Sequence, residues 1–443
     1  MKIGFGRSDV TPRVGVELCG FGPFLQRRSV GLRDRLWARA AAFELADRRV
    51  VLVSCDLIGV TASITARVRR LVGRATGLAD DDILVHATHT HSGPAVGAYI
   101  GWGESDAPYL ELLPDRIAAA CIAAVGQCRP ARLSHAEAPC EGIGLNREYD
   151  RDRPPLEDAL RDDWRPAKPE LTNLTAHVLR ADADGRCLGF LSYYGCHPVV
   201  CCAATRQIHG DYCGVATNLV ERDHPGAVGL FLQGAQGDIN SCVVHQAEAE
   251  SLAALDVIAA RYARVIREGL SAARPIEVDT IRRARRQVTF HRKPWDRAKL
   301  ASLLAEQEAV LHAPGADHAD QNFRMAMVRA TALRQLLAAL EAGRSLEPPA
   351  ELHGLRLGPL ALLGAPLEVF RAIAVEATEQ AVSPLPLVMG FTGDSIGYAV
   401  DRTAAARGGY AADLVPLVCG ALPFADIHGE LVEALAALDA ALH

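Results

Sequence analysis

Two histidines two residues apart are the side chains best placed for metal chemistry in this chain. They lie in the motif THTHSGP over 88–94, directly after an apolar run over 83–85 that is typical of a strand. Side chains at i and i+2 of a strand point the same way, so His89 and His91 can face one pocket. Neutral imidazole is a good ligand for zinc, and the pair therefore suits a divalent metal ion. Two solvated or core-capping histidines would give the same pattern.

Three more polar side chains interrupt apolar runs where a strand ends. His197 stands before Pro198 at the end of the apolar segment 191–196, and Tyr398 lies in a glycine-rich loop after a strand. Glu368 comes after Gly-Ala-Pro, where we expect a strand to end and a helix to begin. Strand ends are where α/β proteins usually hold reactive groups. The simpler interpretations are a capped strand for His197 and a first-turn carboxylate that the helix dipole favours for Glu368.

Strands and helices are mixed along the chain rather than strictly alternating, which predicts an α/β (mixed α+β) fold of mixed β-sheets flanked by helices. The metal site is expected at strand ends. The expected strands and hairpins cover 36–57, 83–88, 174–194, 228–233 and 352–363. The expected helices cover 61–78, 110–128, 247–273 and 429–442, with a helical pair over 295–343 that breaks near Pro314.

Composition excludes several classes of function. The chain has 443 residues, of which 49% are hydrophobic and 23% charged, with a net charge of -6 and no basic block. Nucleic acid is therefore not an expected partner. The twelve cysteines include several in apolar patterns, and the sequence opens with no apolar leader and holds no stretch of 18 apolar residues. We expect a reduced, cytoplasmic protein without a transmembrane segment, and a homo-oligomer stays open.

The chain resembles the neutral/alkaline ceramidase family in its N-terminal catalytic domain, over about residues 3–425. The motifs that carry the resemblance are GFGRSDVTP over 4–12, THTHSGP over 88–94, Asn146-Arg147, Cys196-His197-Pro198, Gly-Asp-Ile-Asn over 237–240 and the region 390–410. They occur in the order typical of the family. The resemblance implies one catalytic domain over 1–443, without the C-terminal β-domain of ceramidases.

The resemblance also implies a zinc ion and its four ligands. The first histidine of THTHSGP is His89, and the strand-end histidine before proline is His197. Glu368 matches the glutamate of a Pro-Gly-Glu-Phe type segment loosely, and Tyr398 matches the tyrosine of the late glycine-rich loop. Two imidazoles and a carboxylate leave room for a water molecule on zinc, as in other hydrolytic sites.

Three further residues match catalytic positions of the family. His91 is placed to pass a proton to a leaving amine. Arg147 and Tyr410 are candidates for stabilising an oxyanion or binding a carboxylate of the substrate.

Three more polar residues are expected to support the site. Asp238 and Asp56 could each fix the tautomer of an imidazole, although Asp238 could simply satisfy backbone amides in its turn. His209, in Ile208-His209-Gly210-Asp211, is an additional site candidate. The loops 98–106 and 149–166 are expected to wall the pocket, with Trp102 and Trp164 as lining candidates.

One departure from the family changes the expected chemistry. Asn240 stands where the ceramidase turn carries a serine, and Ser241 and Cys242 follow it. We expect Asn240 to orient a substrate carbonyl or a water molecule. The resemblance, read with this departure, implies a zinc-dependent hydrolase of a linear or cyclic amide, with a small-molecule N-acyl amine as substrate. The alternatives are a true ceramidase, a metal-independent acyl hydrolase that uses Ser241 or Cys242, and a non-catalytic binding protein.

Overall fold

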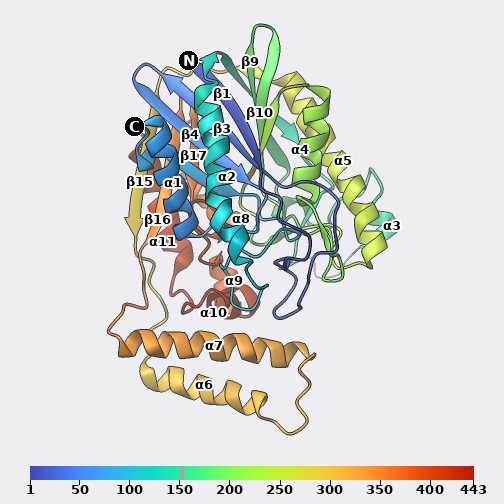
Figure 1. Ribbon diagram of the computed structural model, residues 1–443, viewed down its shortest axis with the longest axis vertical. Helices are drawn as coiled ribbons and strands as arrows, with labels where there is room; N and C mark the ends of the chain where they lie inside the picture. Colours follow the sequence, from blue (N-terminus) through green and yellow to red (C-terminus); the bar gives the residue numbers. More distant parts are fainter. Residues whose placement is uncertain (150–153) are drawn as a thin grey trace.

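The computed structural model describes residues 1–149 and 154–443, and three β-sheets occupy its centre (Figure 1). The first has the strand order β5-β4-β3-β1-β6. Its strands are β1 (Lys2–Asp9), β3 (Trp37–Leu45), β4 (Arg48–Cys55), β5 (Ile83–Ala87) and β6 (Arg129–Pro130). The hairpin predicted over 36–57 is confirmed as β3 and β4, whose turn has Ala46 in the left-handed region.

Two helices cover one face of this first sheet. Helix α1 (Ala62–Thr76) begins at Thr61, whose side chain accepts a hydrogen bond from Ile64 N, and ends at Gly77 with a φ of 77°. Helix α2 (Ala107–Gly126) begins at Asp106 in the same way. Apolar side chains of both helices pack with the first sheet in one core. The helices and the strand β5 are where the sequence predicts them.

The second sheet has the order β12-β10-β9-β7-β14. Its strands are β7 (Arg132–Pro139), β9 (Thr175–Ala183), β10 (Arg186–Tyr194), β12 (Val228–Gln233) and β14 (Arg274–Pro275). The predicted hairpin over 174–194 is confirmed, and β12 runs parallel to β10. Helices α4 (Asp211–Asp223) and α5 (Glu248–Ala272) share a core with this sheet. The sequence patterns predict α5 but not α4.

The third sheet has the order β15-β16-β17-β19. Its strands are β15 (Ile281–Val288), β16 (Ala350–Leu357), β17 (Leu360–Gly364) and β19 (Leu385–Met389), and helices α8 (Arg371–Glu379) and α11 (Ile427–Ala440) pack with it. Between β15 and β16 the chain forms a hairpin of α6 (Arg297–Leu311) and α7 (Gln321–Glu341), as predicted. This hairpin projects from the body of the molecule (Figure 1, bottom).

The remaining elements are short. They are β2 (Gly31–Leu32), β8 (Gly144–Asn146), β11 (Gln207–Ile208), β13 (Ile239–Ser241), β18 (Glu368–Val369), β20 (Tyr398–Ala399), α3 (Leu156–Ala159), α9 (Arg402–Arg407) and α10 (Val415–Val418), 3₁₀ turns at Asp80–Asp82 and Pro169–Leu171, and a π-helical turn, η3 (Tyr410–Leu414).

One prediction about these elements is wrong. Glu368 does not lie in the first turn of a helix: it pairs with Tyr398 in the small parallel ladder of β18 and β20, and α8 begins only at Arg371. The ladder requires an extended backbone at Glu368, where its amide donates to Gly397 O. A helix dipole therefore does not account for this carboxylate.

The inner faces of the three sheets meet in one central core. Phe5, Leu52, Leu191, Leu232 and Leu362 are examples of buried side chains that the sheets contribute to it. Burial of this apolar surface holds the three sheets against one another. Within the described residues, no helix is long and apolar enough to cross a membrane.

Candidate active site

The carboxyl ends of strands from all three sheets meet at one place. Gln233 N at the end of β12 donates to Nε2 of His86 on β5, at 2.8 Å. The loop after β19 joins both, because Gly390 N donates to Gln233 O and Gly393 N donates to Val85 O. Burial lowers the pKa of His86 to about 3, so its neutral ring can accept this bond. His86 was not among the candidates from the sequence.

His89 leaves the end of β5 in a strained backbone conformation. Its φ is 69°, in the left-handed region that a non-glycine residue rarely adopts. The ring stacks on Phe391 with centroids 4.0 Å apart, and Nδ1 donates to Ile58 O at 2.6 Å. When this ring donates from Nδ1 in its neutral form, Nε2 on the other side carries no proton.

His197, after β10, is held in the same way. Its Nδ1 donates to Gln236 O at 2.8 Å, and its backbone amide donates to Ile239 O. Burial lowers the pKa of this imidazole to about 4, so the ring is neutral and its Nε2 is bare. Both predicted histidine ligands thus have their tautomers fixed by backbone carbonyls.

Glu368 and Tyr398 bring oxygen atoms to the same point. Glu368 Oε2 lies 3.0 Å from His197 Nε2 and 3.4 Å from His89 Nε2, and the Tyr398 hydroxyl lies 3.4 Å from His197 Nε2. Ligands about 2.0–2.2 Å from a tetrahedral zinc ion stand roughly 3.3–3.6 Å apart. The two separations of 3.4 Å lie in this range, and the separation of 3.0 Å is slightly shorter.

His91 lies at the same centre. Its Nε2 is 3.0 Å from His89 Nε2, and the nitrogens of His89, His91 and His197 lie close enough together to bind one metal ion. Its Nδ1 has no hydrogen-bond partner among the described residues and packs against Gly20, where a Cβ would stand 2.6 Å from it. Burial and the neighbouring histidines lower the pKa of His91 well below its usual value.

A cavity of about 240 Å³ opens onto this centre. The predicted residues that line it are His91, Arg147, His197, Asn240, Tyr398 and Tyr410, beside apolar side chains such as Phe21, Trp102 and Met325. Met325 comes from α7, a contribution that the sequence did not suggest. Trp164 instead packs on the core beside α5, and residues 150–153 of its loop lie outside the described part of the chain.

Arg147 and Asn240 form one wall of the cavity. Arg147 Nη1 donates to Asn240 Oδ1 at 3.4 Å, Nη2 donates to Gly237 O at 2.6 Å, and the guanidinium lies 5.2 Å from the Tyr398 ring centroid. Since the Asn240 oxygen accepts from Arg147, its amide NH2 remains as a donor toward the cavity.

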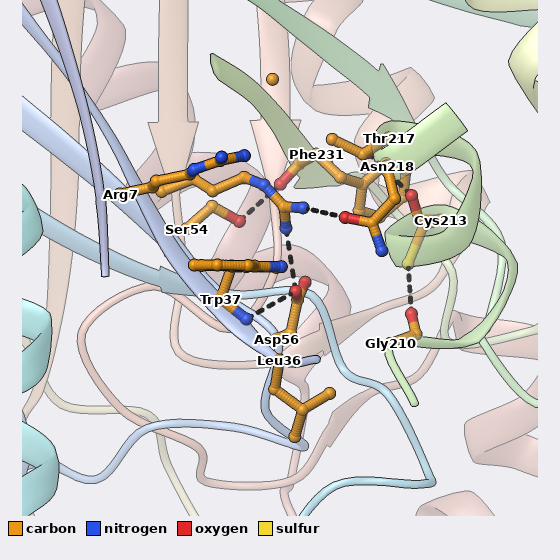
Figure 2. A network of polar contacts seen from close by, with 12 residues as sticks. Arg7, Leu36, Trp37, Ser54, Asp56, Gly210, Cys213, Thr217, Asn218 and Phe231 are labelled. Carbon is orange, nitrogen blue, oxygen red and sulfur yellow. Dashed lines mark hydrogen bonds and ion pairs between the residues drawn. The ribbon is translucent and has the colours of Figure 1, made fainter. Parts of the chain in front are cut away.

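Two of the three residues expected to support the imidazoles contact other groups. Asp238 accepts from Asn146 Nδ2 and Arg371 N, and its burial raises its pKa to about 6. Asp56 accepts from Trp37 N and Arg39 Nη1 in a buried network that reaches Asn218 on α4 (Figure 2). Neither carboxylate hydrogen-bonds an imidazole. The carbonyls of Ile58 and Gln236 take that role, because they lie on the segments that pack directly against the rings.

His209 lies in a separate buried group with Cys201 and Asp211, whose ligand atoms are also close enough for a metal ion. Here the tautomer is different. His209 Nδ1 accepts from Asp211 N at 3.1 Å, so the proton of the neutral ring is on Nε2, which faces Cys201 Sγ at 3.5 Å. This group presents no bare imidazole nitrogen, and it supports the THTHSGP loop instead: Thr90 Oγ1 donates to His209 O.

The sequence of this chain is similar to that of known proteins. Residues 1–252 match the family described as neutral/alkaline non-lysosomal ceramidase, N-terminal. The neutral ceramidase of Pseudomonas aeruginosa is 27% identical over 252 residues, covering 54% of this chain and 37% of that protein. The neutral ceramidase of Mycobacterium tuberculosis is 25% identical over 267 residues, covering 54% and 40%. The matched segments thus span well under two thirds of these relatives.

Solved structures share the fold. The crystal structure of neutral ceramidase from Pseudomonas aeruginosa superposes with a TM-score of 0.73 and 20% identity, covering 100% of this chain and 75% of that one. A second structure, described as ceramidase complexed with C2, gives a TM-score of 0.75 at 19% identity, with the same coverage. With more than half of its residues matched to the family, this chain belongs to the neutral/alkaline non-lysosomal ceramidases.

Proposed function

We propose that this chain hydrolyses the amide bond of N-acyl amines of the ceramide type, at a zinc ion held by His89, His197, Glu368 and Tyr398. The family supports an amidohydrolase that acts on a carbon–nitrogen bond outside peptides. The relatives named neutral ceramidase favour a ceramide-type amide over the small soluble amide that the sequence alone predicts.

The main support for a metal ion is that three hydrogen-bond acceptor atoms face one another at this site. The bare Nε2 atoms of His89 and His197 face Glu368 Oε2 at 3.4 and 3.0 Å, so their lone pairs oppose one another in a buried space. A divalent cation satisfies all three atoms at once, and when bound it polarises a carbonyl and acidifies water.

The chain's own polar groups then have distinct tasks. His91 Nε2 is placed to hold a proton and give it to the leaving amine. The Asn240 amide donates to the substrate carbonyl, and Arg147 fixes the orientation of Asn240. The guanidinium adds a positive charge where negative charge develops on the carbonyl oxygen.

Ser241 and Cys242 are poorly placed for the metal-independent alternative. Both are buried, and neither lines the cavity to which Asn240 belongs. Burial raises the pKa of the Cys242 thiol to about 12, so it stays protonated at neutral pH. The nucleophile that fits the cavity is therefore water.

Elemental analysis tests the metal site. We expect His89→Ala and Glu368→Ala each to lose about one zinc equivalent relative to the unaltered protein, since each removes a ligand. The control is His312→Ala, at the exposed end of α6. Equal zinc content in all four proteins, or none in the unaltered protein after zinc is supplied, would overturn the proposed site.

A substrate panel tests the reaction. N-acylsphingosines dispersed in detergent should be cleaved to free amine, with loss of turnover in Glu368→Ala. The cavity of about 240 Å³ is smaller than the roughly 300–1,000 Å³ of typical ligand sites, which favours a short N-acyl amine or lactam as a second candidate. Cleavage of short amides alone would select that candidate, and no cleavage of either class would refute both.

A further inference from the structure

A cavity separate from the active site lies at the base of the projecting hairpin of α6 and α7 (Figure 1). It has a volume of about 680 Å³, within the range of roughly 300–1,000 Å³ that ligand sites usually have. Its lining comes from the chain just before α6, the end of α7 with the loop after it, and the segments 394–396 and 419–421. Among the described residues, none lines both this cavity and the active-site cavity.

Arg292, between β15 and α6, brings a buried positive charge to this cavity. The residue is 6% exposed, its Nη1 donates to Leu422 O at 2.7 Å, and the guanidinium carbon lies 3.5 Å from the Phe424 ring centroid. Burial lowers the pKa of Arg292 to about 10, so the side chain stays charged at neutral pH. Glu347 binds its backbone amide, and no carboxylate in the described part of the chain forms an ion pair with its guanidinium.

One edge of this guanidinium is unpaired. Nε of Arg292 is buried without a hydrogen-bond partner, and Nη2 donates to no atom of the described residues. Nε–H and Nη2–H point the same way, and together they form the fork that binds two oxygens of a carboxylate or phosphate group. A buried cation that lacks a partner is costly, and an oxyanion on this edge would remove that cost.

The other charged groups of the cavity leave room for an anion. Arg344, exposed in the loop after α7, is a second cation of the lining and forms no ion pair with the described residues. Asp394 is the only acid among the described lining residues. Its Oδ1 already accepts from the backbone amides of Ala62 at 3.0 Å and Ser395 at 2.8 Å.

The apolar part of the lining indicates that the anion has an organic body. Phe290, Leu336 and Ile396 line the same cavity as Arg292. An inorganic ion would leave these side chains without a partner, whereas an apolar body would bury their surface. The space therefore fits a ligand with one charged end and one apolar end.

We propose that this cavity, the anion cavity, binds a small organic anion whose carboxylate or phosphate group pairs with Nε and Nη2 of Arg292. Its apolar body lies against Phe290, Leu336 and Ile396. The proposal does not depend on the hydrolysis proposed above. Because the cavity lies where the chain enters and leaves the α6–α7 hairpin, such a ligand would tie the hairpin to the body of the molecule.

Calorimetric titration of the full chain tests the anion cavity without any turnover. The probes 1-naphthoate and 1-naphthyl phosphate carry the two candidate groups on one apolar body. The neutral 1-naphthamide lacks the charge, and inorganic phosphate lacks the body. We expect at least one naphthyl anion to bind, with a Kd at least about tenfold lower than that of 1-naphthamide or inorganic phosphate. The tighter of the two anions identifies the preferred group.

Variants of the two arginines locate the bound anion. Arg292→Gln should raise the Kd at least about tenfold, and Arg292→Lys should have a smaller effect because it keeps the charge but not the fork. Arg344→Gln, at an exposed position where the fold is not at risk, should raise the Kd about twofold or more. The control is Arg286→Gln, at an exposed position of β15 outside the cavity, which should leave the Kd unchanged.

Glu368→Ala separates the anion cavity from the active site, where an anion could bind the proposed zinc ion. We expect this variant to bind the naphthyl anion with unchanged Kd. The proposal is wrong if neither anion binds, if 1-naphthamide or inorganic phosphate binds as tightly, or if Glu368→Ala weakens binding while the arginine variants do not. Each of these results is independent of whether the chain cleaves an amide, so the two proposals fail separately.

Discussion

At the scale of single residues, the position of each imidazole proton decides what the side chain can do. His89 and His197 each donate a hydrogen bond from Nδ1 to a backbone carbonyl, so in the neutral ring Nε2 carries no proton. His209 has the opposite tautomer because a backbone amide donates to its Nδ1. The tautomer therefore separates three buried histidines: His89 and His197 are candidates for metal ligands, whereas His209 supports the THTHSGP loop.

His91 gives the prediction for this scale. We expect His91→Asn to lower kcat by roughly 10²–10⁴-fold, because the leaving amine loses its proton donor. Zinc content should stay unchanged, as measured by elemental analysis beside the activity assay. Loss of the metal together with activity would instead make His91 a ligand.

Most residues of the candidate centre could be predicted from the sequence, but their partners could not. His89 and His91 follow from a strand and a two-residue spacing, and Glu368 from a polar residue after a strand. The carbonyl of Ile58 reaches the His89 ring because β4 and β5 pair side by side in the first sheet, and Phe391 reaches it because the loop after β19 of the third sheet packs there. Such contacts join residues far apart in the chain, and no local pattern encodes them.

At the scale of elements, helix α2 needs close contact with β1. A Cβ at Gly6 would stand 2.4 Å from Ala120 O and 2.6 Å from Ala124 N, both backbone atoms of α2. Gly6→Ala should therefore lower the free energy of unfolding by about 1–3 kcal/mol, measured by urea denaturation. Gly126→Ala, at the open end of the same helix, is the control and should be neutral or slightly stabilising.

An ion pair between α1 and β16 gives a pH-dependent prediction. Burial alone would raise the pKa of Glu351, but hydrogen bonds from His353 and Arg69 lower it from 4.5 to about 2. A carboxyl group with a depressed pKa stabilises the folded chain above its unfolded value and loses this contribution as the pH falls toward 2.

We therefore expect Glu351→Gln to lower the free energy of unfolding near neutral pH, with the difference shrinking below about pH 4.5. Urea denaturation at a series of pH values measures it, with the exposed Glu268→Gln on α5 as the control. A destabilisation that stays constant down to the lowest pH would show that the ionised carboxylate is not what stabilises the contact.

Local patterns predict elements well where one signal dominates. The hairpins over 36–57 and 174–194 have charged or Asp-Gly turns between apolar runs, and both are confirmed. The prediction fails for Glu368, because a long-range pairing with Tyr398 extends a backbone that would locally start a helix. Helix α4 escapes prediction because it is buried on most sides and has no clear polar stripe.

At the scale of the whole molecule, a buried ion-pair network joins the first sheet to helix α4, which packs with the second sheet (Figure 2). Arg39 donates to Asp56 at 2.9 Å, to Glu221 at 3.1 Å and to Asn218 on α4. All three charged groups are almost fully buried. Removing the cation would leave the buried Asp56 carboxylate without its ion-pair partner, and Glu221 would keep only the ion pair with Arg7.

Arg39→Met should thus destabilise the fold by about 3–5 kcal/mol. Lys2→Met, which removes the exposed pair with Glu44, should cost less than about 1 kcal/mol. Thermal and urea unfolding measure both variants. Equal effects would mean that the buried network does not hold the layers together.

The four proposed ligands come from two separate parts of the chain. His89 and His197 lie inside the segment that matches the family, whereas Glu368 and Tyr398 lie beyond residue 252. A comparison confined to the first segment therefore covers only half of the proposed metal centre. A relative that lacks a glutamate and a tyrosine meeting on a short parallel ladder later in the chain, as they do here in β18 and β20, would lack the other two proposed ligands.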